Sequence, residues 1–380
     1  MINLVKNTIS ENEINLLIDW LKTNPRLTKG NFTETFQKKW NEYLGRKSSI
    51  FVSSGSSANL AAFYSLKLSN KLKNNVCILP AVSWSTTVAP AIQLGYDPIL
   101  CDCNLKNYGL DLDHLKFLIK KYNPGLVVTC NVLGFANDYD EIIDLCKKND
   151  IMIIEDSCES VGTLYKNKMT GCFGDISTFS FYYGHHMSTI EGGMVCTDDP
   201  ELSKIITSIR CHGWDRDLNE LDRTQLRNQF MIDDFRGMYS FYYPGFNMRC
   251  SDLQAFIGVN QLDRLEEMNK KRHDNFNLYK SLDKSSWDID IDNYQFISNM
   301  AYPVMVENVN EMSKKLNKNN IENRPLICGS IGRQPFWVSK YGLQKDLKNA
   351  DKIHDYGIYV PNNPDLSKNE IELISKILWD

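Results

Sequence analysis

The sequence predicts an α/β fold in which helices cover a mostly parallel sheet. Apolar strand-like runs alternate with helical runs of about ten residues between positions 49 and 155. This alternation is typical of βαβ units, which pair their strands in parallel. The strand-like segments are 49–53, 76–79, 98–101, 126–130 and 151–155, and the helical segments between them are 56–66, 86–94, 112–121 and 139–148. Two further apolar stretches, 176–181 and 193–197, are expected to add strands to the sheet.

A helix is expected ahead of the first strand, over residues 11–23, because its apolar residues recur at helical spacing. These residues are Ile14, Leu16, Leu17, Trp20 and Leu21. After Asp215 the pattern changes to a polar and aromatic segment that ends at Gly245. A segment of this kind is expected to be a long loop, and long loops inside compact domains are usually functional or mobile.

A single long helix is predicted from Asp252 to Tyr279, where an apolar stripe continues at helical spacing. The remaining residues alternate between a strand-like segment, 296–306, and two helical segments, 309–316 and 368–378. The predicted organisation is therefore two domains. Residues 1–250 form a large α/β domain, and residues 251–380 form a small C-terminal α+β domain.

Composition argues against nucleic acid and membranes as partners. The 380 residues include 43 Lys and Arg against 47 Asp and Glu, a formal charge of −4, and the basic residues are scattered rather than gathered on one face. The longest uncharged stretch, 76–96, is interrupted by two prolines and is expected to be strand, loop and buried helix. The N-terminal residues lack the pattern of a signal peptide, and the eleven Cys show no disulfide spacing, so we expect a soluble cytoplasmic protein.

Two strand ends carry candidate ligand-binding residues. The first strand runs into a turn of small residues that includes Gly55, Ser56 and Ser57, and a helix follows. Backbone N–H groups at such a helix start bind phosphate well, although a plain Gly/Ser turn reads the same way. Asp156 follows the strand at 151–155, where parallel sheets place their ligands. A helix cap or a solvated turn is the alternative for this carboxylate.

Two adjacent histidines, His185 and His186, follow the strand-like segment 176–181. A zinc site is disfavoured, because neighbouring side chains on an extended chain point to opposite faces and no further ligand spacing accompanies the pair. At least one of the two histidines is expected to have a structural role.

Together these segments resemble the DegT/DnrJ/EryC1/StrS family of pyridoxal-phosphate-dependent nucleotide-sugar enzymes. The resemblance covers nearly the whole chain and consists of many short motifs in the same order. The motifs are Leu27-Thr28-Lys29-Gly30, Ser54-Gly55-Ser56-Ser57-Ala58, Pro80-Ala81-Val82-Ser83-Trp84, Glu155-Asp156-Ser157-Cys158-Glu159, Ser180-Phe181, Glu191-Gly192-Gly193, Arg210-Cys211-His212-Gly213, Gly245-Phe246-Asn247-Met248-Arg249 and Arg333-Gln334-Pro335.

The resemblance implies the aspartate-aminotransferase type of fold, a homodimer with shared active sites, and pyridoxal or pyridoxamine 5′-phosphate as cofactor. It implies that Asp156 pairs with the ring nitrogen, so that the ring acts as an electron sink. Glu159 stands near the 3-hydroxyl, where most family members have Gln. The remaining residues implied to hold the cofactor are Gly55, Ser56, Ser57 and Ser180 at the phosphate, Trp84 on the ring and Asn247 from the partner subunit.

One departure from the family pattern bears on function. Members that transaminate sugars carry a Lys six residues before the Glu-Gly-Gly motif, and this Lys forms a Schiff base with the cofactor. Here that position is His185. Imidazole forms no stable Schiff base but moves protons near neutral pH. His185 therefore resembles the catalytic residue of the sugar 3-dehydratases within the family.

This resemblance implies a hydro-lyase that removes the C3 hydroxyl of a nucleotide-linked 4-keto-6-deoxyhexose. The substrate it implies most strongly is GDP-linked 4-keto-6-deoxymannose. L-glutamate would regenerate the pyridoxamine form. Arg216 and Arg249 are candidates for its carboxylates, and Arg333 is a further substrate-binding candidate. An iron–sulfur cluster, which one related group carries, is disfavoured because the Cys after the His pair are dispersed. An aminotransferase that uses another Lys and a non-catalytic relative are the alternatives.

Overall fold

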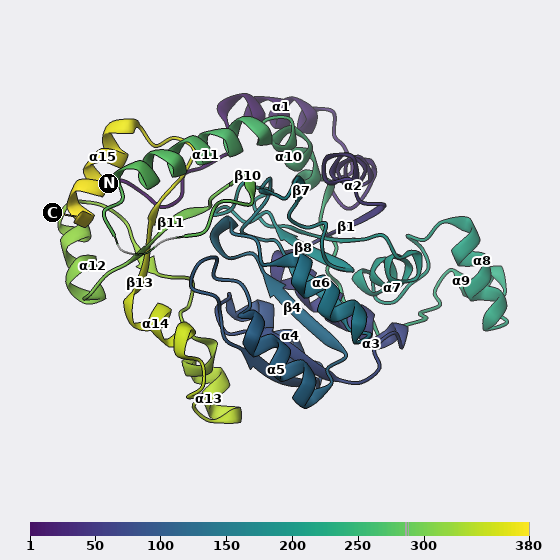
Figure 1. Cartoon of the computed structure of the whole chain (residues 1–380). Coiled ribbons are helices and arrows are strands. Elements are labelled where there is room, and N and C mark those ends of the chain that lie inside the picture. Colours follow the sequence, from purple (N-terminus) through teal and green to yellow (C-terminus); the bar gives the residue numbers. More distant parts are fainter. Residues whose placement is uncertain (286, 288, 380) are drawn as a thin grey trace.

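A seven-stranded mixed sheet forms the centre of the computed structural model, which describes residues 1–285, 287 and 289–379 (Figure 1). The strand order is β1-β9-β8-β5-β4-β2-β3. β9 runs antiparallel to both of its neighbours, and the other six strands are parallel to one another. The strands are β1 (Ser48–Val52), β2 (Val76–Pro80), β3 (Asp97–Cys101), β4 (Leu126–Cys130), β5 (Met152–Asp156), β8 (Ile176–Ser180) and β9 (Gly193–Thr197). The predicted α/β class is confirmed, and each of the seven strands falls on a segment expected from the sequence.

Helices cover both faces of this sheet, because alternate strand residues point to opposite sides. Val52, Leu79 and Ile154 pack under α3, α4 and α7, while Phe51 and Phe179 face α2 on the other side. α5 and α6 cover the β2–β5 part of that second face. The helices up to residue 237 are α1 (Glu11–Lys22), α2 (Asn31–Leu44), α3 (Gly55–Ser69), α4 (Ser85–Gln93), α5 (Leu112–Tyr122), α6 (Tyr139–Lys148), α7 (Pro200–Arg210), α8 (Glu220–Gln229) and α9 (Asp234–Gly237), with a short 3-10 turn at Val132–Gly134.

A second, antiparallel sheet of order β11-β13-β12 lies in the C-terminal part and packs with α12 and α15. Its strands are β11 (Ala301–Met305), β12 (Arg324–Pro325) and β13 (Gly357–Pro361), and the short strands β10 (Tyr294–Phe296), β6 (Leu164–Tyr165) and β7 (Lys168–Met169) form a third sheet. The C-terminal helices are α10 (Asp252–Leu262), α11 (Leu265–Leu282), α12 (Val309–Lys318), α13 (Pro335–Tyr341), α14 (Lys348–Tyr356) and α15 (Lys368–Trp379), with a 3-10 turn at Ile331–Arg333. α10 packs against α2, whereas α11 packs against α15, so the domain boundary at residue 250 stays a prediction.

The segment after Asp215 is not the loop that we expected. It contains α8 and α9, which project from the body on the right of Figure 1. α8 is mostly polar, and its two leucines, Leu221 and Leu226, do not form the apolar periodicity that reveals a helix. Local polar contacts hold it: Asn219 caps its N-terminus, and Arg227 pairs with the buried Asp215 at 2.9 Å.

The single helix predicted from Asp252 to Tyr279 is also wrong. A turn at Asp263 and Arg264 separates α10 from α11, which begins at Leu265. Arg264 forms an ion pair with Glu13, with 3.0 Å between Arg264 Nη1 and Glu13 Oε2. The strand-like segment 296–306 is likewise divided, because β10 pairs with β6 and β11 pairs with β13.

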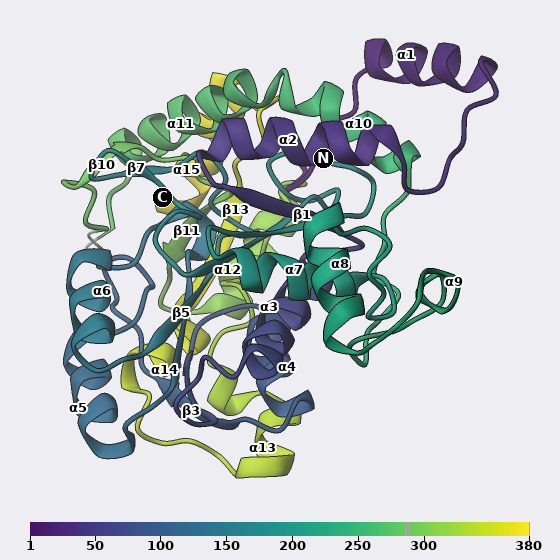
Figure 2. The ribbon, with the colours of Figure 1, turned by 90° about the vertical axis from the view of Figure 1, so that its right-hand side faces the viewer.

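The predicted helix at residues 11–23 is confirmed as α1, which extends away from the body in Figure 2. Its apolar face is largely uncovered, since Ile14, Leu16 and Leu21 are each more than a third exposed. Trp20 is the exception and stacks on Phe256 of α10, with ring centroids 4.8 Å apart. Within the described part of the chain, no helix combines the length and apolarity needed to span a bilayer.

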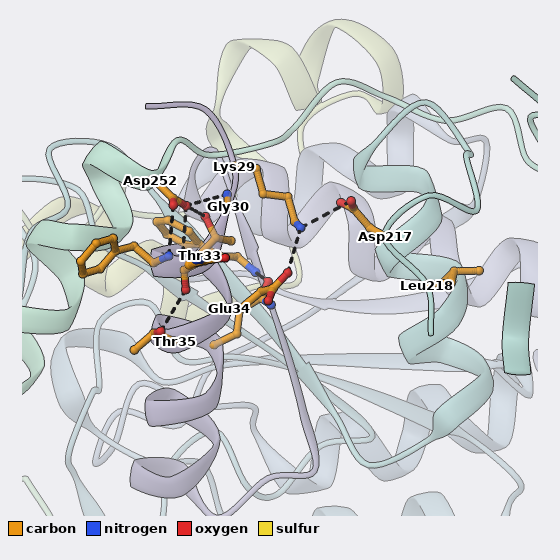
Figure 3. Close-up of polar contacts among 12 residues, drawn as sticks. Lys29, Gly30, Thr33, Glu34, Thr35, Asp217, Leu218 and Asp252 are labelled. Carbon is orange, nitrogen blue, oxygen red and sulfur yellow. Dashed lines mark hydrogen bonds and ion pairs between the residues drawn. The ribbon is translucent and has the colours of Figure 1, made fainter. Parts of the chain in front are cut away.

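A distant carboxylate holds the start of α2. Gly30 occupies the capping position but has no side chain to cap with, and Asp252 at the start of α10 supplies the acceptor (Figure 3). Its Oδ1 accepts hydrogen bonds from the N–H of Gly30 (2.7 Å), the N–H of Thr33 (3.0 Å) and the Thr33 hydroxyl (2.7 Å). Its Oδ2 accepts from the N–H of Phe32 at 3.0 Å. A Cβ at position 30 would lie 2.8 Å from Oδ2, so this approach requires glycine.

The buried Asp252→Asn substitution should lower the free energy of unfolding by about 3 kcal/mol, because an amide offers one acceptor oxygen and no charge to four donors. Urea denaturation measures the loss. The control is Asp263→Asn, which removes an exposed carboxylate paired with Lys39 and should cost less than about 1 kcal/mol. Equal losses for the two variants would contradict the assignment of Asp252 as the cap of α2.

Candidate active site

A cavity of about 490 Å³ opens at the carboxyl ends of the parallel strands, where α/β sheets place their ligands. The loops after β1, β2, β5 and β8 supply one side of it, and residues of the C-terminal part supply the other. Seven of the residues singled out in the sequence line it together. They are Gly55, Ser56, Trp84, Asp156, Glu159, Ser180 and His185.

The turn between β1 and α3 presents a helix N-terminus to the cavity. Ser54 caps α3 and accepts a hydrogen bond from the N–H of Ser57 at 3.0 Å. A Cβ at position 55 would lie 2.6 Å from the Cβ of Ser180, so Gly55 allows the two segments to meet. The Ser57 hydroxyl bonds to those of Ser53 and Ser54, and this residue lies outside the cavity lining. The N–H groups at the start of α3 are suited to a phosphate.

The carboxylate of Asp156 is held at the end of β5 by three donors. Its Oδ2 accepts from Asn59 Nδ2 at 2.9 Å and from the Thr87 hydroxyl at 2.7 Å, and its Oδ1 accepts from the N–H of Cys158 at 3.1 Å. Asn59 is itself oriented by the Thr178 hydroxyl, which donates to its Oδ1 at 2.7 Å. A carboxylate held by three donors in a buried site keeps one orientation toward the cavity.

Asn59 and Thr87 were not predicted as site residues. They lie one turn into α3 and α4, and both helices start directly after strands that end at the cavity. Their only sequence signal is a polar residue on an otherwise apolar helix face, since the neighbours Ala58, Ala62 and Val88 belong to the core.

Glu159 is a buried carboxylic acid in the wall of the cavity. Its Oε2 accepts a hydrogen bond from the N–H of Leu133 at 2.8 Å, and Leu133 adopts a left-handed conformation with φ of 52°. Burial raises the pKa of Glu159 to about 8, the hydrogen bond from Leu133 opposes this shift, and the carboxylate of Asp156 adds to it. Glu159 is therefore protonated at neutral pH and can donate a hydrogen bond into the cavity.

The two histidines differ in position. His185 lines the cavity, and its Nδ1 is enclosed without a hydrogen-bond partner. Burial lowers the pKa of His185 to about 4, although the carboxylate of Asp156 works in the opposite direction. The ring is therefore neutral and can accept a proton. His186 is completely buried, with its Nε2 2.9 Å from the carbonyl oxygen of Ser298, and it fastens the loop to the segment before β11. Among the described residues, no group of three or more His, Cys, Asp or Glu side chains could hold a metal ion.

The other predicted residues lie outside the cavity lining of this chain. Asn247 is exposed and accepts from Arg249 Nε at 3.1 Å. Arg216 lies over the ring of Trp214, 5.3 Å from its centroid, and Arg333 pairs with Asp355 at 2.7 Å.

The arginine in the cavity lining is Arg324, which pairs with Glu322 at 2.5 Å. Glu322 also accepts from the N–H of Leu4 at 2.9 Å and so ties the N-terminal segment to the cavity wall. Neither residue was predicted, because a charged residue on a short edge strand carries no pattern that separates it from a surface residue.

Fold and site together define a pyridoxal-phosphate type of enzyme: a helix start for a phosphate, an oriented carboxylate, and a proton-accepting ring around one cavity. A model of the DegT/DnrJ/EryC1/StrS aminotransferase family matches residues 7–378. The chain therefore belongs to this family, and the resemblance inferred from the sequence motifs is confirmed.

Individual relatives agree with this placement. The chain is 34% identical over 396 residues to the GDP-4-keto-6-deoxy-D-mannose 3-dehydratase of Yersinia pseudotuberculosis, with 99% of each chain covered. Two crystal structures of GDP-4-keto-6-deoxymannose-3-dehydratase superpose over 100% of both chains with a TM-score of 0.90. One is a variant with bound GDP-perosamine, 27% identical, and the other has a trapped PLP-glutamate geminal diamine and is 28% identical. The predicted aminotransferase fold is confirmed by these matches.

The raised pKa of Glu159 predicts a pH-dependent stability. A carboxyl group with a pKa of about 8 in the folded state and 4.5 when unfolded must take up a proton on folding at any pH between these values. Its contribution is therefore full below pH 4.5 and falls as the pH rises toward 8, by on the order of 5 kcal/mol. Urea denaturation of cofactor-free protein should show this fall for the wild type and not for Glu159→Gln. Glu191→Gln, at an exposed cavity residue, should behave as the wild type. A Glu159→Gln variant with the wild-type pH dependence would contradict the assignment.

Proposed function

We propose that this protein is a pyridoxal/pyridoxamine-phosphate-dependent 3-dehydratase that removes the C3 hydroxyl of GDP-4-keto-6-deoxy-D-mannose. The observation that carries the proposal is His185, a neutral imidazole that lines the cavity with Asp156 at the position where sugar-transaminating members of the family have Lys. The likeness to 3-dehydratases over the full chain length supports the same reading.

The residues of the cavity fit the cofactor. Gly55 leaves space where a side chain would collide with Ser180, so a phosphate can approach the N–H groups at the start of α3. Ser56 and Ser180 line the same end of the cavity and offer hydroxyl groups, and the Trp84 ring is half exposed and free to stack on a planar ligand. When bound, the cofactor supplies an electron sink conjugated to the reacting carbon atoms.

Asp156 holds the pyridine nitrogen protonated in this proposal, and the three donors around the carboxylate keep it aimed at the ring. Glu159, protonated at neutral pH, donates its proton toward the phenolic oxygen of the cofactor. The two acids therefore differ in their surroundings, because Asp156 accepts hydrogen bonds from three donors and Glu159 accepts one from the N–H of Leu133.

His185 moves the protons of the reaction. As a neutral base it takes a proton from the cofactor's C4′ carbon, and as an acid it gives a proton to the departing C3 hydroxyl oxygen, which leaves as water. L-glutamate supplies the amino group and the two electrons. The overall balance is a 4-keto sugar plus glutamate giving the 3-deoxy-4-keto sugar, 2-oxoglutarate and ammonia.

An aminotransferase is the second candidate, and the cavity disfavours it. No lysine is found among the described residues that line the cavity. Lys166 pairs with Asp140, and the Lys168 amine lies 4.9 Å from the ring centroid of Phe173, both away from the cavity. The intact Asp156 network likewise disfavours a non-catalytic relative.

We further propose a homodimer in which Asn247 and Arg249 serve the partner's cavity. Both lie outside the cavity of their own chain. Asn247 forms an isolated antiparallel β-bridge with Cys211, which precedes the segment that contains α8 and α9. Arg216, Arg249 and Arg333 stay candidates for substrate and glutamate carboxylates. A cytoplasmic location is proposed because all eleven cysteines are free thiols, as suits a reducing compartment.

His185→Asn should bind cofactor and lower the dehydration rate by roughly a hundred- to ten-thousandfold, because the variant lacks the acid–base group. The rate is measured as release of 2-oxoglutarate and of the 3-deoxy product, and cofactor binding is followed by absorbance. His186→Asn is the matched control and should act mainly on stability, since this ring bonds to Ser298 outside the cavity. Wild-type turnover by His185→Asn would overturn the proposed role.

The shared site can be tested by complementation. His185→Asn and Asn247→Ala homodimers should each be impaired, whereas a co-expressed and purified heterodimer should regain about half of the wild-type rate, because one of its two sites is then complete. Sedimentation checks that all species are dimers. If Asn247 serves its own chain, both heterodimer sites carry a defect and no recovery is seen.

A further inference from the structure

A buried guanidinium lies beneath the loop that carries His185. Arg272, in the middle of α11, is almost fully buried. Its Nη1 donates to the carbonyl oxygens of Met300 (3.0 Å) and Asn362 (2.7 Å), and its Nη2 donates to the carbonyl oxygen of His185 (3.4 Å). One side chain thus joins the His185 loop to two other segments.

Those two segments border the strands of the C-terminal sheet. Met300 precedes β11 and Asn362 follows β13. The Asn362 side chain returns the contact, because its Nδ2 donates to the carbonyl oxygen of Arg272 at 3.1 Å and to that of Asn299 at 2.9 Å. Met300 also lines the cavity, so the clamp fixes a wall of the site together with its base.

The same network reaches Glu159. The carbonyl oxygen of Leu133 accepts from Asn299 Nδ2 at 2.7 Å and from the N–H of Met300 at 3.1 Å. The N–H of Leu133 donates to Glu159. Hydrogen bonds therefore connect Arg272 to His185 directly, and to Glu159 through the segment before β11.

The charge of Arg272 is not neutralised by a contacting acid. Within the described residues it forms no ion pair, its partners are carbonyl oxygens, and its Nε is buried without a partner. Burial lowers its pKa to about 10, so it stays charged at neutral pH. The carboxylate of Asp365 favours the charged form of Arg272 and partly opposes the effect of burial on its pKa.

The ionisable groups around His185 come from several elements. Asp156 favours the charged form of the ring, whereas Arg272 opposes it. His186 is the neighbouring ring in the same loop, and Glu159 and Glu191 line the same cavity. Burial is the largest of these influences and lowers the pKa of His185, so removal of the guanidinium raises that pKa without cancelling the effect of burial.

We propose that Arg272 is the positioning residue of His185: it clamps the His185 loop to the ends of β11 and β13, and its positive charge adds to the burial that keeps the imidazole a neutral base. This role rests on the proposed function of His185. It explains why an uncompensated cation is kept in the interior, where burial alone would disfavour it.

The test compares Arg272→Gln, which removes the charge and most of the clamp, with Arg272→Lys, which keeps the charge. Arg272→Gln should lower kcat by roughly ten- to a hundredfold through displacement of the base, with KM for the nucleotide sugar changed far less. The acidic limb of its kcat/KM profile should move to higher pH, because His185 then binds a proton more readily. Arg272→Lys should keep the wild-type limb while losing part of the rate.

NMR titration of the cofactor-free protein supplies a readout that does not need turnover. The His185 ring signal, assigned by its loss in His185→Asn, should stay that of a neutral ring from pH 5 to 8 in the wild type, and its protonation should begin at a higher pH in Arg272→Gln than in the wild type. Arg264→Gln is the control. Arg264 precedes the first residue of α11 and pairs with Glu13 away from the cavity.

An unshifted His185 titration together with an unshifted pH profile in folded Arg272→Gln would overturn the proposal. If Arg272→Gln does not fold, Arg272→Lys decides. This variant keeps the charge, so a shifted acidic limb or a shifted His185 titration in it would overturn the proposal. The two proposals can fail separately. If His185 titrates as predicted in both the wild type and Arg272→Gln but the wild type dehydrates no nucleotide sugar, the proposed function is contradicted and the effect of Arg272 on His185 is still supported.

Discussion

The carboxylate of Asp156 stands at the end of β5 with donors from α3, α4 and its own loop around it, and the rest of the site is arranged about this charge. Asn59 and Thr87 can reach it only if α3 and α4 start where β1 and β2 end. A buried carboxylate without these donors would take up a proton, since desolvation disfavours the charge. Glu159, three residues further along the chain and with one backbone donor, shows this outcome in the same cavity.

The two neighbouring histidines of one loop have different roles, one structural and one at the cavity. His186 is buried against Ser298 and acts as an anchor, which leaves His185 directed at the cavity. The two rings lie in a loop of turns and bends after β8, in which the N–H of His185 donates to the carbonyl oxygen of Tyr182 at 2.9 Å, so one ring can be structural while the next one reacts. The Arg272 clamp adds a second attachment, through the His185 carbonyl oxygen, so the loop is fixed by both its backbone and a side chain. A base that moves a proton between two atoms needs this degree of positioning.

The sequence predicts the central sheet well because its strands are buried on both faces and appear as continuous apolar runs. It misses α2, whose cap is Asp252, more than two hundred residues further along the chain. α7 was also missed, although Asp199 and Pro200 give a local start signal. α8 was predicted as loop because polar contacts rather than an apolar face hold it. Asp156 and His185 were predictable from family motifs, whereas Arg324 and Arg272 gain their meaning only from three-dimensional neighbours.

The central claim is that the cavity eliminates a hydroxyl group instead of delivering an amino group, because His185 replaces a lysine in it. Mass spectrometry of the sugar product tests this most directly, with glutamate and a panel of GDP-, CDP-, UDP- and dTDP-linked 4-keto-6-deoxy sugars as substrates. The account predicts a 3-deoxy-4-keto product from the GDP-linked sugar, with one 2-oxoglutarate and one ammonia released per turnover. A 4-amino sugar that retains its C3 hydroxyl, formed without ammonia release, would contradict it.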